Sequence, residues 1–268
     1  MSDDINIFVL TFNQMINFEY DENLYKPLIC GQSDFNAQNY LRDDAGDNIS
    51  HLNKYYSELT GQYWAWKNTN QDIIGFCQYR RWFAKNLRWE QLSKLDIEND
   101  LKEYDIILPH RLNTRQSLYE FQKSLNKWNP EYDVLYGDYV KLGEVLEEYF
   151  SDYADYYEKV MNSKILWTNN MFICRRKLAD DYLGWLFDVL DKFNRELDLS
   201  NYDSRDTRIF GFVAERLLTT YVLKNNLKIK EYPVYSTERK FPILQVLYAR
   251  IPLLLSLENA ISILMRKL

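Results

Sequence analysis

Asp72-Ile-Ile-Gly-Phe-Cys-Gln-Tyr-Arg-Arg-Trp-Phe83 runs from an apolar segment directly into two adjacent arginines. A continuous apolar run of this kind is typical of a strand buried on both faces of a parallel sheet. Ligands of open α/β sheets bind beyond the carboxyl ends of such strands, where guanidinium groups can hold a diphosphate through paired hydrogen bonds. Because strand side chains alternate between faces, we expect one of Arg80 and Arg81 to face the ligand. A solvated arginine pair is the alternative interpretation.

Two further apolar runs, residues 6–11 and 105–109, extend this prediction to a whole sheet. Helical stretches separate the three runs, and strand–helix–strand alternation predicts a mostly parallel sheet with right-handed crossovers, an α/β fold. Thr11 and Asn13 follow the first run and are expected in the ligand crevice. His110 follows the third run and is expected in the same crevice, with a structural histidine as the alternative.

Further along the chain the helical pattern dominates. Residues 117–157 are predicted to be helical, and residues 172–174 form a short strand. Amphipathic helices are expected over residues 182–197 and 208–223. Together these elements predict one domain over residues 1–235.

The composition narrows the function classes. A net charge of −6 without a concentrated basic face argues against a general nucleic-acid binder. The 22 tyrosines and 7 tryptophans suit stacking on sugars and bases, although core packing accounts for most such rings. Cys30, Cys77 and Cys174 are far apart and lack clustered histidines, so neither a zinc site nor a disulfide framework is predicted and the compartment is expected to be reducing.

The two ends of the chain suggest its location. The first residues carry acids and no basic region before the apolar run, so they are interpreted as a first strand and not as a signal peptide. The C-terminal segment comprises residues 236–268, of which residues 241–268 are apolar with Arg250, Arg266 and Lys267 spaced through them and Pro252 interrupting them. This pattern favours an amphipathic helical segment at the inner membrane surface, with a helix packed on the core as the alternative. We expect a cytoplasmic protein, peripheral on the inner face of the cell membrane.

Residues 43–50 form a turn-like loop with three carboxylates ahead of a predicted helix that continues to residue 68. Such a loop can chelate a divalent ion or hydrogen-bond a ribose and a uracil; an acidic turn that caps the helix is the alternative. Helical spacing would place Lys54 and Glu58 on one face of that helix.

Glu215 and Arg216 fall on the predicted helix over residues 208–223, flanked by apolar residues. A carboxylate on a half-buried face has a raised pKa, which suits a general base near neutral pH. An ordinary ion pair with Arg216 explains the two residues equally well.

Several motifs together resemble one family of proteins. They are Asp44…Gly46-Asp47-Asn48-Ile49-Ser50…Asn53…Glu58-Leu59-Thr60-Gly61…Tyr63-Trp64…Trp66-Lys67-Asn68, then Gly75-Phe76-Cys77-Gln78-Tyr79-Arg80-Arg81-Trp82-Phe83, Asn169-Asn170-Met171-Phe172 and Gly211-Phe212…Glu215-Arg216-Leu217-Leu218. This string is similar to the bacterial capsular and exopolysaccharide glycosyltransferases long catalogued as a domain of unknown function. The chain departs from that pattern at Gln78, where the family usually has histidine.

The resemblance implies a GT-A-like fold, a nucleotide-diphosphate sugar as donor and a lipid-linked glycan as acceptor. Some members are similar to galactofuranosyltransferases, which suggests UDP-galactofuranose as the donor. Metal-dependent GT-A enzymes carry Asp-X-Asp where this chain has arginines, and cationic side chains can replace Mg²⁺ or Mn²⁺ at a departing diphosphate. The resemblance therefore implies no cofactor firmly. A divalent metal ion is not favoured; if one binds, residues 43–47 are its expected site.

The sequence thus predicts an inverting glycosyltransferase in which a base takes a proton from the acceptor hydroxyl while cations hold the donor diphosphate. A non-catalytic carbohydrate-binding or scaffolding protein of a surface-polysaccharide complex is the alternative. The expected residues are Glu215 as catalytic base; Thr11, Asn13, Asp44, Asn48, Ser50, Lys54, Arg80, Arg81 and His110 for the donor; and Trp66, Asn169 and Asn170 for the acceptor.

Overall fold

The computed structural model describes residues 3–16, 18–35, 37–86, 89–128, 133–202 and 208–237. The strands are β1 (Ile5–Thr11), β2 (Tyr25–Ile29), β3 (Leu41–Arg42), β4 (Ile73–Gln78), β5 (Arg81–Phe83), β6 (Ile106–Pro109), β7 (Leu112–Asn113), β8 (Ile165–Leu166), β9 (Phe172–Arg175), β10 (Ile229–Tyr232) and β11 (Val234–Ser236). The helices are η1 (Ser50–Leu52), α1 (Asn53–Tyr56), α2 (Leu59–Asn68), α3 (Lys94–Glu103), α4 (Leu118–Trp128), α5 (Asp133–Tyr149), α6 (Ser151–Met161), α7 (Arg176–Arg195), η3 (Leu199–Asn201) and α8 (Ile209–Lys224).

A central sheet with the order β10-β6-β9-β4-β1-β2-β3 organises the molecule. Its β1, β2, β3 and β4 are mutually parallel, and β10 is parallel to β6. The predicted mostly parallel sheet is therefore confirmed, including the short strand at residues 172–174. The strand β9 lies between β4 and β6 and is antiparallel to both.

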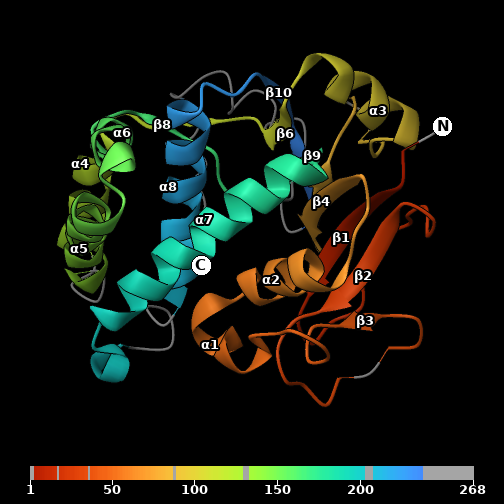
Figure 1. The fold of residues 1–268 in the computed structure, drawn as a ribbon, viewed down its shortest axis with the longest axis horizontal. Helices are drawn as coiled ribbons and strands as arrows, with labels where there is room; N and C mark the ends of the chain where they lie inside the picture. Colours follow the sequence, from red (N-terminus) through yellow and green to blue (C-terminus); the bar gives the residue numbers. More distant parts are fainter. Residues whose placement is uncertain are drawn as a thin grey trace, which may run out of the picture.

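Alternating side chains of β1 supply two apolar cores, one on each face of the sheet. Ile5, Ile7 and Val9 pack with residues of α3, whereas Phe8 and Leu10 belong to the larger core beneath the other helices. Figure 1 shows α7 running across this second face with α8 beside it, and α4, α5 and α6 gathered away from β2 and β3. A strand buried on both faces needs apolar residues at successive positions, which explains the continuous runs in the sequence.

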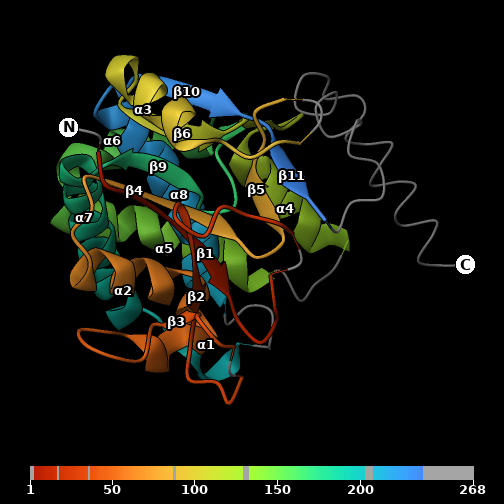
Figure 2. The same cartoon turned by 90° about the vertical axis from the view of Figure 1, so that its right-hand side faces the viewer.

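The chain reverses after β4. Gln78 pairs with Arg81 in a tight antiparallel hairpin, so Tyr79 and Arg80 occupy the turn and Arg81 begins β5. Figure 2 shows β11 beside β5, with which it pairs in antiparallel register. The arginine pair therefore belongs to a hairpin at the carboxyl end of β4 rather than to the end of a single strand.

The helix predicted up to residue 68 is broken. Ser57 has φ 51° and ψ −129°, a left-handed conformation that disfavours residues with a Cβ, and it separates α1 from α2. The Asn53 side chain stabilises the break by donating from Nδ2 to the Ser57 carbonyl at 2.8 Å. Lys54 and Glu58 consequently do not share a continuous helical face, and that prediction is wrong.

The helices predicted over residues 117–157, 182–197 and 208–223 are present as α4 to α6, α7 and α8. The boundary placed at residue 235 falls inside β11. Most of the predicted C-terminal segment, residues 238–268, lies outside the described residues. Within the described part of the chain, no helix is long and apolar enough to cross a membrane.

A substitution of Gly75 tests how closely β4 packs against its neighbouring strands. A Cβ there would lie 2.6 Å from Ile7 Cδ1 and 2.8 Å from Ile173 Cγ1, so these two buried side chains on the neighbouring strands would have to shift. We expect Gly75→Ala to lower the free energy of unfolding by about 1–3 kcal/mol, measured by urea denaturation.

Gly137 on α5 is the matched control, because a Cβ there meets nothing within 4 Å. Gly137→Ala should raise stability by roughly 0.5–1 kcal/mol through helix propensity alone. Equal effects of the two substitutions would contradict the packing described for β4.

Candidate functional site

Two adjoining cavities open at the carboxyl ends of β1, β2 and β4. The first, of about 490 Å³, is lined by Leu10, Phe12, Asn53, Lys54, Ser57, Glu58, Gln78, Tyr79, Arg80, Arg81 and Arg208. The second, of about 720 Å³, is lined by Phe12, Asn13, Cys30, Gly31, Gln32, Ser33, Asp34, Phe35, Ser50, His51, Asn53 and Lys54. Phe12, Asn53 and Lys54 border both cavities, so we treat them as one groove. This is the position at which parallel sheets bind ligands.

Cations dominate the first cavity. Lys54, Arg80, Arg81 and Arg208 line it, against the single carboxylate of Glu58. The Arg80 guanidinium lies 4.5 Å from the centre of the Tyr79 ring, a cation–π contact. The expectation that only one of Arg80 and Arg81 faces the cavity is wrong, because the hairpin turn removes strict alternation between faces.

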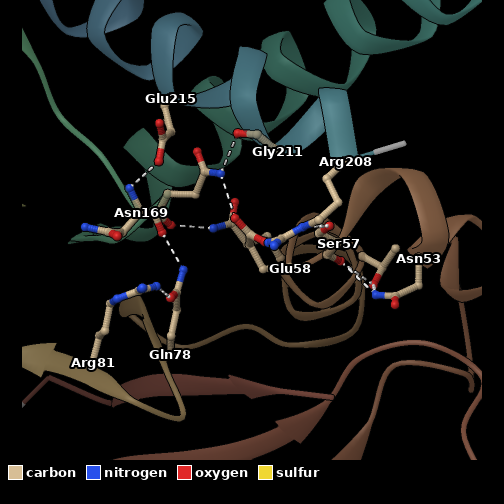
Figure 3. A network of polar contacts seen from close by, with 12 residues as sticks. Asn53, Ser57, Glu58, Gln78, Arg81, Asn169, Arg208, Gly211 and Glu215 are labelled. Carbon is tan, nitrogen blue, oxygen red and sulfur yellow. Dashed lines mark hydrogen bonds and ion pairs between the residues drawn. The ribbon is translucent and has the colours of Figure 1, made fainter. Parts of the chain in front are cut away.

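Gln78 orients Arg81. Its Oε1 accepts a hydrogen bond from Arg81 Nη1, and its Nε2 donates to the Asn169 carbonyl at 2.9 Å. Figure 3 shows this chain of contacts running from Arg81 through Gln78 to Asn169. Gln78 thus keeps a hydrogen-bonding role at the position where the resembling family usually has histidine.

Glu58 lies directly after the strained Ser57, and its side chain is 9% exposed. Asn170 Nδ2 donates to Glu58 Oε1 at 2.9 Å, and the same nitrogen donates to the Gly211 carbonyl at 2.9 Å. Arg208 Nη2 lies 3.6 Å from Glu58 Oε2. Burial of a charged group is costly unless hydrogen bonds and an opposite charge compensate for the lost water. Asn170 and Arg208 provide that compensation for the Glu58 carboxylate.

Sequence reasoning missed both Glu58 and Arg208 as site residues. Glu58 was expected on one face of a continuous helix with Lys54, and only the break at Ser57 reveals its actual environment. Arg208 donates from Nε to Ser57 Oγ at 3.0 Å, across 151 positions of sequence. No local pattern in the chain could have signalled that contact.

The three carboxylates of the loop over residues 43–50 do not converge on one point. Asp43 is buried, and its Oδ1 accepts hydrogen bonds from Gly31 N at 2.9 Å and from Ser50 Oγ at 2.6 Å. Asp44 pairs with Arg42 at 2.9 Å, and Asp47 accepts from the Tyr63 hydroxyl at 3.1 Å.

These partners determine what the loop can bind. Burial raises the pKa of the Asp43 carboxyl, against the hydrogen bond from Ser50. In the described part of the chain, no three His, Cys, Asp or Glu side chains are grouped to hold a metal ion. The residues of this loop therefore do not fit the fallback metal site that the sequence suggested.

The other predicted donor residues divide into two groups. Asn13, Ser50, Lys54, Arg80 and Arg81 line the groove. Outside its lining are Thr11, which is buried and donates to the Gln14 carbonyl, Asp44, Asn48, which donates to the Gly46 carbonyl, and His110, which is held to the Tyr232 carbonyl beyond β6. The strand β9 separates β6 from β4, which explains why His110 does not reach the groove.

The predicted acceptor residues are engaged elsewhere in the fold. Trp66 stacks on Phe187 of α7, with ring centres 5.9 Å apart, and helps to join α2 to α7. Asn170 is buried against Glu58, and Asn169 offers its carbonyl to Gln78. Asn169 and Asn170 thus border the site from behind, whereas Trp66 does not.

Glu215 lies behind the groove rather than in its lining. Its Oε1 accepts a hydrogen bond from Asn169 N at 2.6 Å, and Oε2 lies 3.3 Å from Arg216 Nη1. Burial raises the pKa of the Glu215 carboxyl and the charge of Glu58 adds to that rise, whereas Arg216, the Asn169 N–H and Arg81 oppose it. The raised pKa agrees with the sequence interpretation; its role as a base stays a prediction.

The raised pKa of Glu215 makes stability depend on pH. The folded state binds this proton more tightly than the unfolded state, so the contribution of Glu215 to stability falls as pH rises above the ordinary glutamate range. Glu215→Gln, whose amide oxygen can still accept from Asn169, should therefore gain stability relative to the wild type between acid and neutral pH.

Urea denaturation across pH 4–7 measures this trend. Glu144→Gln, an exposed position on α5, controls for the general loss of one negative charge. A Glu215→Gln variant whose relative stability instead declines toward neutral pH would contradict the assigned cause.

The chain is an α/β protein with a groove at the carboxyl ends of its parallel strands, and comparison with known proteins identifies its family and a protein of similar fold. The chain belongs to the family described as "Domain of unknown function (DUF4422)", whose sequence model matches residues 6–226. The chain matches no curated protein. The predicted membership of a family catalogued by its unknown function is thereby confirmed.

Among solved structures, the chain is similar to one described as "WbbM bifunctional glycosytransferase apo structure". The similarity has a TM-score of 0.75 at 24% sequence identity and covers 88% of this chain and 46% of that chain. The chain thus spans about half the length of that structure. At this identity the likeness establishes the fold, and the predicted GT-A-like α/β architecture is confirmed.

Proposed function

We propose that the protein is a glycosyltransferase that moves a sugar from a nucleotide diphosphate to a glycan. The observation that carries the proposal is the convergence of Lys54, Arg80, Arg81 and Arg208 on one cavity at the carboxyl ends of β1 and β4. A departing nucleoside diphosphate develops negative charge, and donors aimed at that charge stabilise the transition state. The fold shared with a bifunctional glycosyltransferase also supports it.

The groove offers a place for each part of such a donor. Lys54 stands where the two cavities meet and would contact the diphosphate between them. The larger cavity, with Asn13, Ser50 and the backbone of Gly31 in its lining, would take the nucleoside. The sugar would then lie in the first cavity beside Glu58 and the arginines. Ligand sites of this kind combine a few polar anchors with apolar walls, here Leu10 and Phe12.

The finer assignments extend the proposal. We propose UDP-galactofuranose as the donor, a lipid-linked glycan of a capsular or exopolysaccharide as the acceptor, and inversion at the anomeric carbon. The motifs quoted from the sequence support these assignments. Trp66 and Asn170 are left out of the proposed acceptor site because packing and hydrogen bonds already engage them.

The rival function is a non-catalytic carbohydrate-binding or scaffolding protein. A panel of nucleoside diphosphates and UDP-sugars separates the two, because a ligand that binds the folded state raises the melting temperature. Slow release of free UDP from a UDP-sugar requires catalysis. Binding of glycans without any UDP release would favour the rival.

Arg81 provides a direct test of the cation cluster. We expect Arg80→Ala and Arg81→Ala each to cost about 2–5 kcal/mol of transition-state stabilisation, measured as kcat/KM for sugar transfer. Arg195→Ala on α7 is the control, since this exposed arginine pairs with Asp191 and lies outside the groove. Unchanged turnover in both groove variants would remove the proposed diphosphate site.

We propose that residues 236–268 bring the groove to the inner face of the cell membrane. Thr237 N donates to the Arg80 carbonyl at 3.0 Å, so the chain enters this segment beside the cavity. Each basic residue near an anionic surface contributes on the order of 1 kcal/mol, and buried apolar side chains add to this.

Truncation before residue 241 should therefore release the protein from phosphatidylserine vesicles, measured by co-sedimentation. Transfer to a soluble acceptor should persist in the truncated chain. If the full-length protein does not bind the vesicles and the truncated chain does not fold, the truncated segment is a helix packed on the core instead.

A further inference from the structure

We infer that Glu58 is the carboxylate that takes the proton from the acceptor hydroxyl, and that Glu215 is a positioning residue behind it. This inference rests on the proposed glycosyl transfer. Glu58 lines the same cavity as Arg80 and Arg81, whereas Glu215 is absent from the lining of the groove. A base must come within hydrogen-bond reach of the proton that it takes.

The backbone places Glu58 in the cavity at the cost of local strain. Ser57 adopts a conformation in which a Cβ is unfavourable, and the surrounding contacts hold it there. Asn53 Nδ2 donates to the Ser57 carbonyl and also to Thr60 Oγ1 at 3.0 Å. Arg208 Nε donates to the Ser57 hydroxyl at 3.0 Å. Strain that the fold maintains in this way is concentrated at functional sites, here next to a cavity-lining carboxylate.

The Glu58 carboxylate is also fixed in orientation. Its Oε1 accepts from Asn170 Nδ2, and Asn170 is itself held by the Gly211 carbonyl and by Gln62 Nε2, which donates to the Asn170 carbonyl at 2.7 Å. Figure 3 shows Glu58 between this cluster and Arg208. A group locked by its neighbours needs no reorganisation when the reaction begins. Oε2, which lies 3.6 Å from Nη2 of the exposed Arg208 side chain, is the oxygen left for the acceptor.

The step balances with groups already in the groove. The acceptor oxygen forms a bond to the anomeric carbon while its proton passes to Glu58. The bond from that carbon to the diphosphate oxygen breaks, and the nucleoside diphosphate leaves with the electron pair beside Arg80, Arg81 and Lys54. Glu58 then releases its proton to solvent.

Glu215 acts indirectly, through the residues that lie between it and Arg81. It holds Asn169 through the backbone N–H at 2.6 Å, and the Asn169 carbonyl accepts from Gln78, which in turn contacts Arg81. Glu215 also attracts Arg81 electrostatically, so loss of the Glu215 charge is expected to disturb the placement of Arg81 and hence donor binding. Loss of the Glu58 charge is expected to disturb the chemical step.

The experiment compares Glu58→Gln, Glu58→Asp and Glu215→Gln in the full chain, using whichever UDP-sugar the wild type turns over. We expect Glu58→Gln to lower kcat by about 10²–10⁴-fold while its dissociation constant for UDP stays within about threefold of wild type. Glu58→Asp should recover part of kcat. Glu215→Gln should mainly weaken UDP binding and raise KM, and Glu144→Gln on α5 should leave both unchanged.

Three outcomes would overturn the inference. One is wild-type kcat in both Glu58 variants, and another is a loss of kcat in Glu215→Gln that matches or exceeds the loss in Glu58→Gln. The third is loss of UDP binding alone in Glu58→Gln, which would make Glu58 a donor-site residue. A wild type that transfers no sugar would instead refute the proposed function itself, and the inference with it. Thermal unfolding of each variant shows whether it is folded, and Glu58→Asp keeps the test valid if Glu58→Gln is not.

Discussion

The packing of β4 between β1 and β9 is the constraint on which the rest of the structure depends. Gly75 allows Ile7 and Ile173 to approach from the two neighbouring strands, so β1, β4 and β9 pack closely. Since β9 is antiparallel to β4, its beginning lies at the carboxyl end of β4. Asn169 and Asn170 precede β9, and this geometry brings them beside Gln78 and Glu58.

Electrostatics in the groove follow from that arrangement. Four cations surround the first cavity, and the carboxylates near them are buried and satisfied by amide or cationic partners. Desolvation makes an unpaired buried charge costly, so each carboxylate requires its hydrogen-bond donors. The lining of the first cavity therefore carries more positive than negative charge, although the whole chain carries a net charge of −6.

Sequence reasoning succeeded where the residues of a single segment determine its structure. The continuous apolar runs of β1 and β4 predicted buried strands, and the spacing of apolar residues predicted α7 and α8. It failed where contacts between distant segments decide. The break at Ser57 is held by a hydrogen bond from Arg208, 151 positions away, and His110 is excluded from the groove by the insertion of β9 between β4 and β6. Periodicity cannot report either effect, because it contains no information on strand order or on long-range partners.

The sequence by itself determined that the chain is an α/β protein with arginines after a buried strand, because burial on two faces requires an unbroken apolar run. It also determined the family, through motifs whose residues are spread along most of the chain. Only the tertiary structure decided which charged residues share the groove. Glu58 and Arg208 lie 150 positions apart in the sequence and 3.6 Å apart in space, and Asp43 is turned inward by Gly31 and Ser50. The physical reason is that the environment of a charged side chain is set by what packs against it, which distant parts of the chain supply.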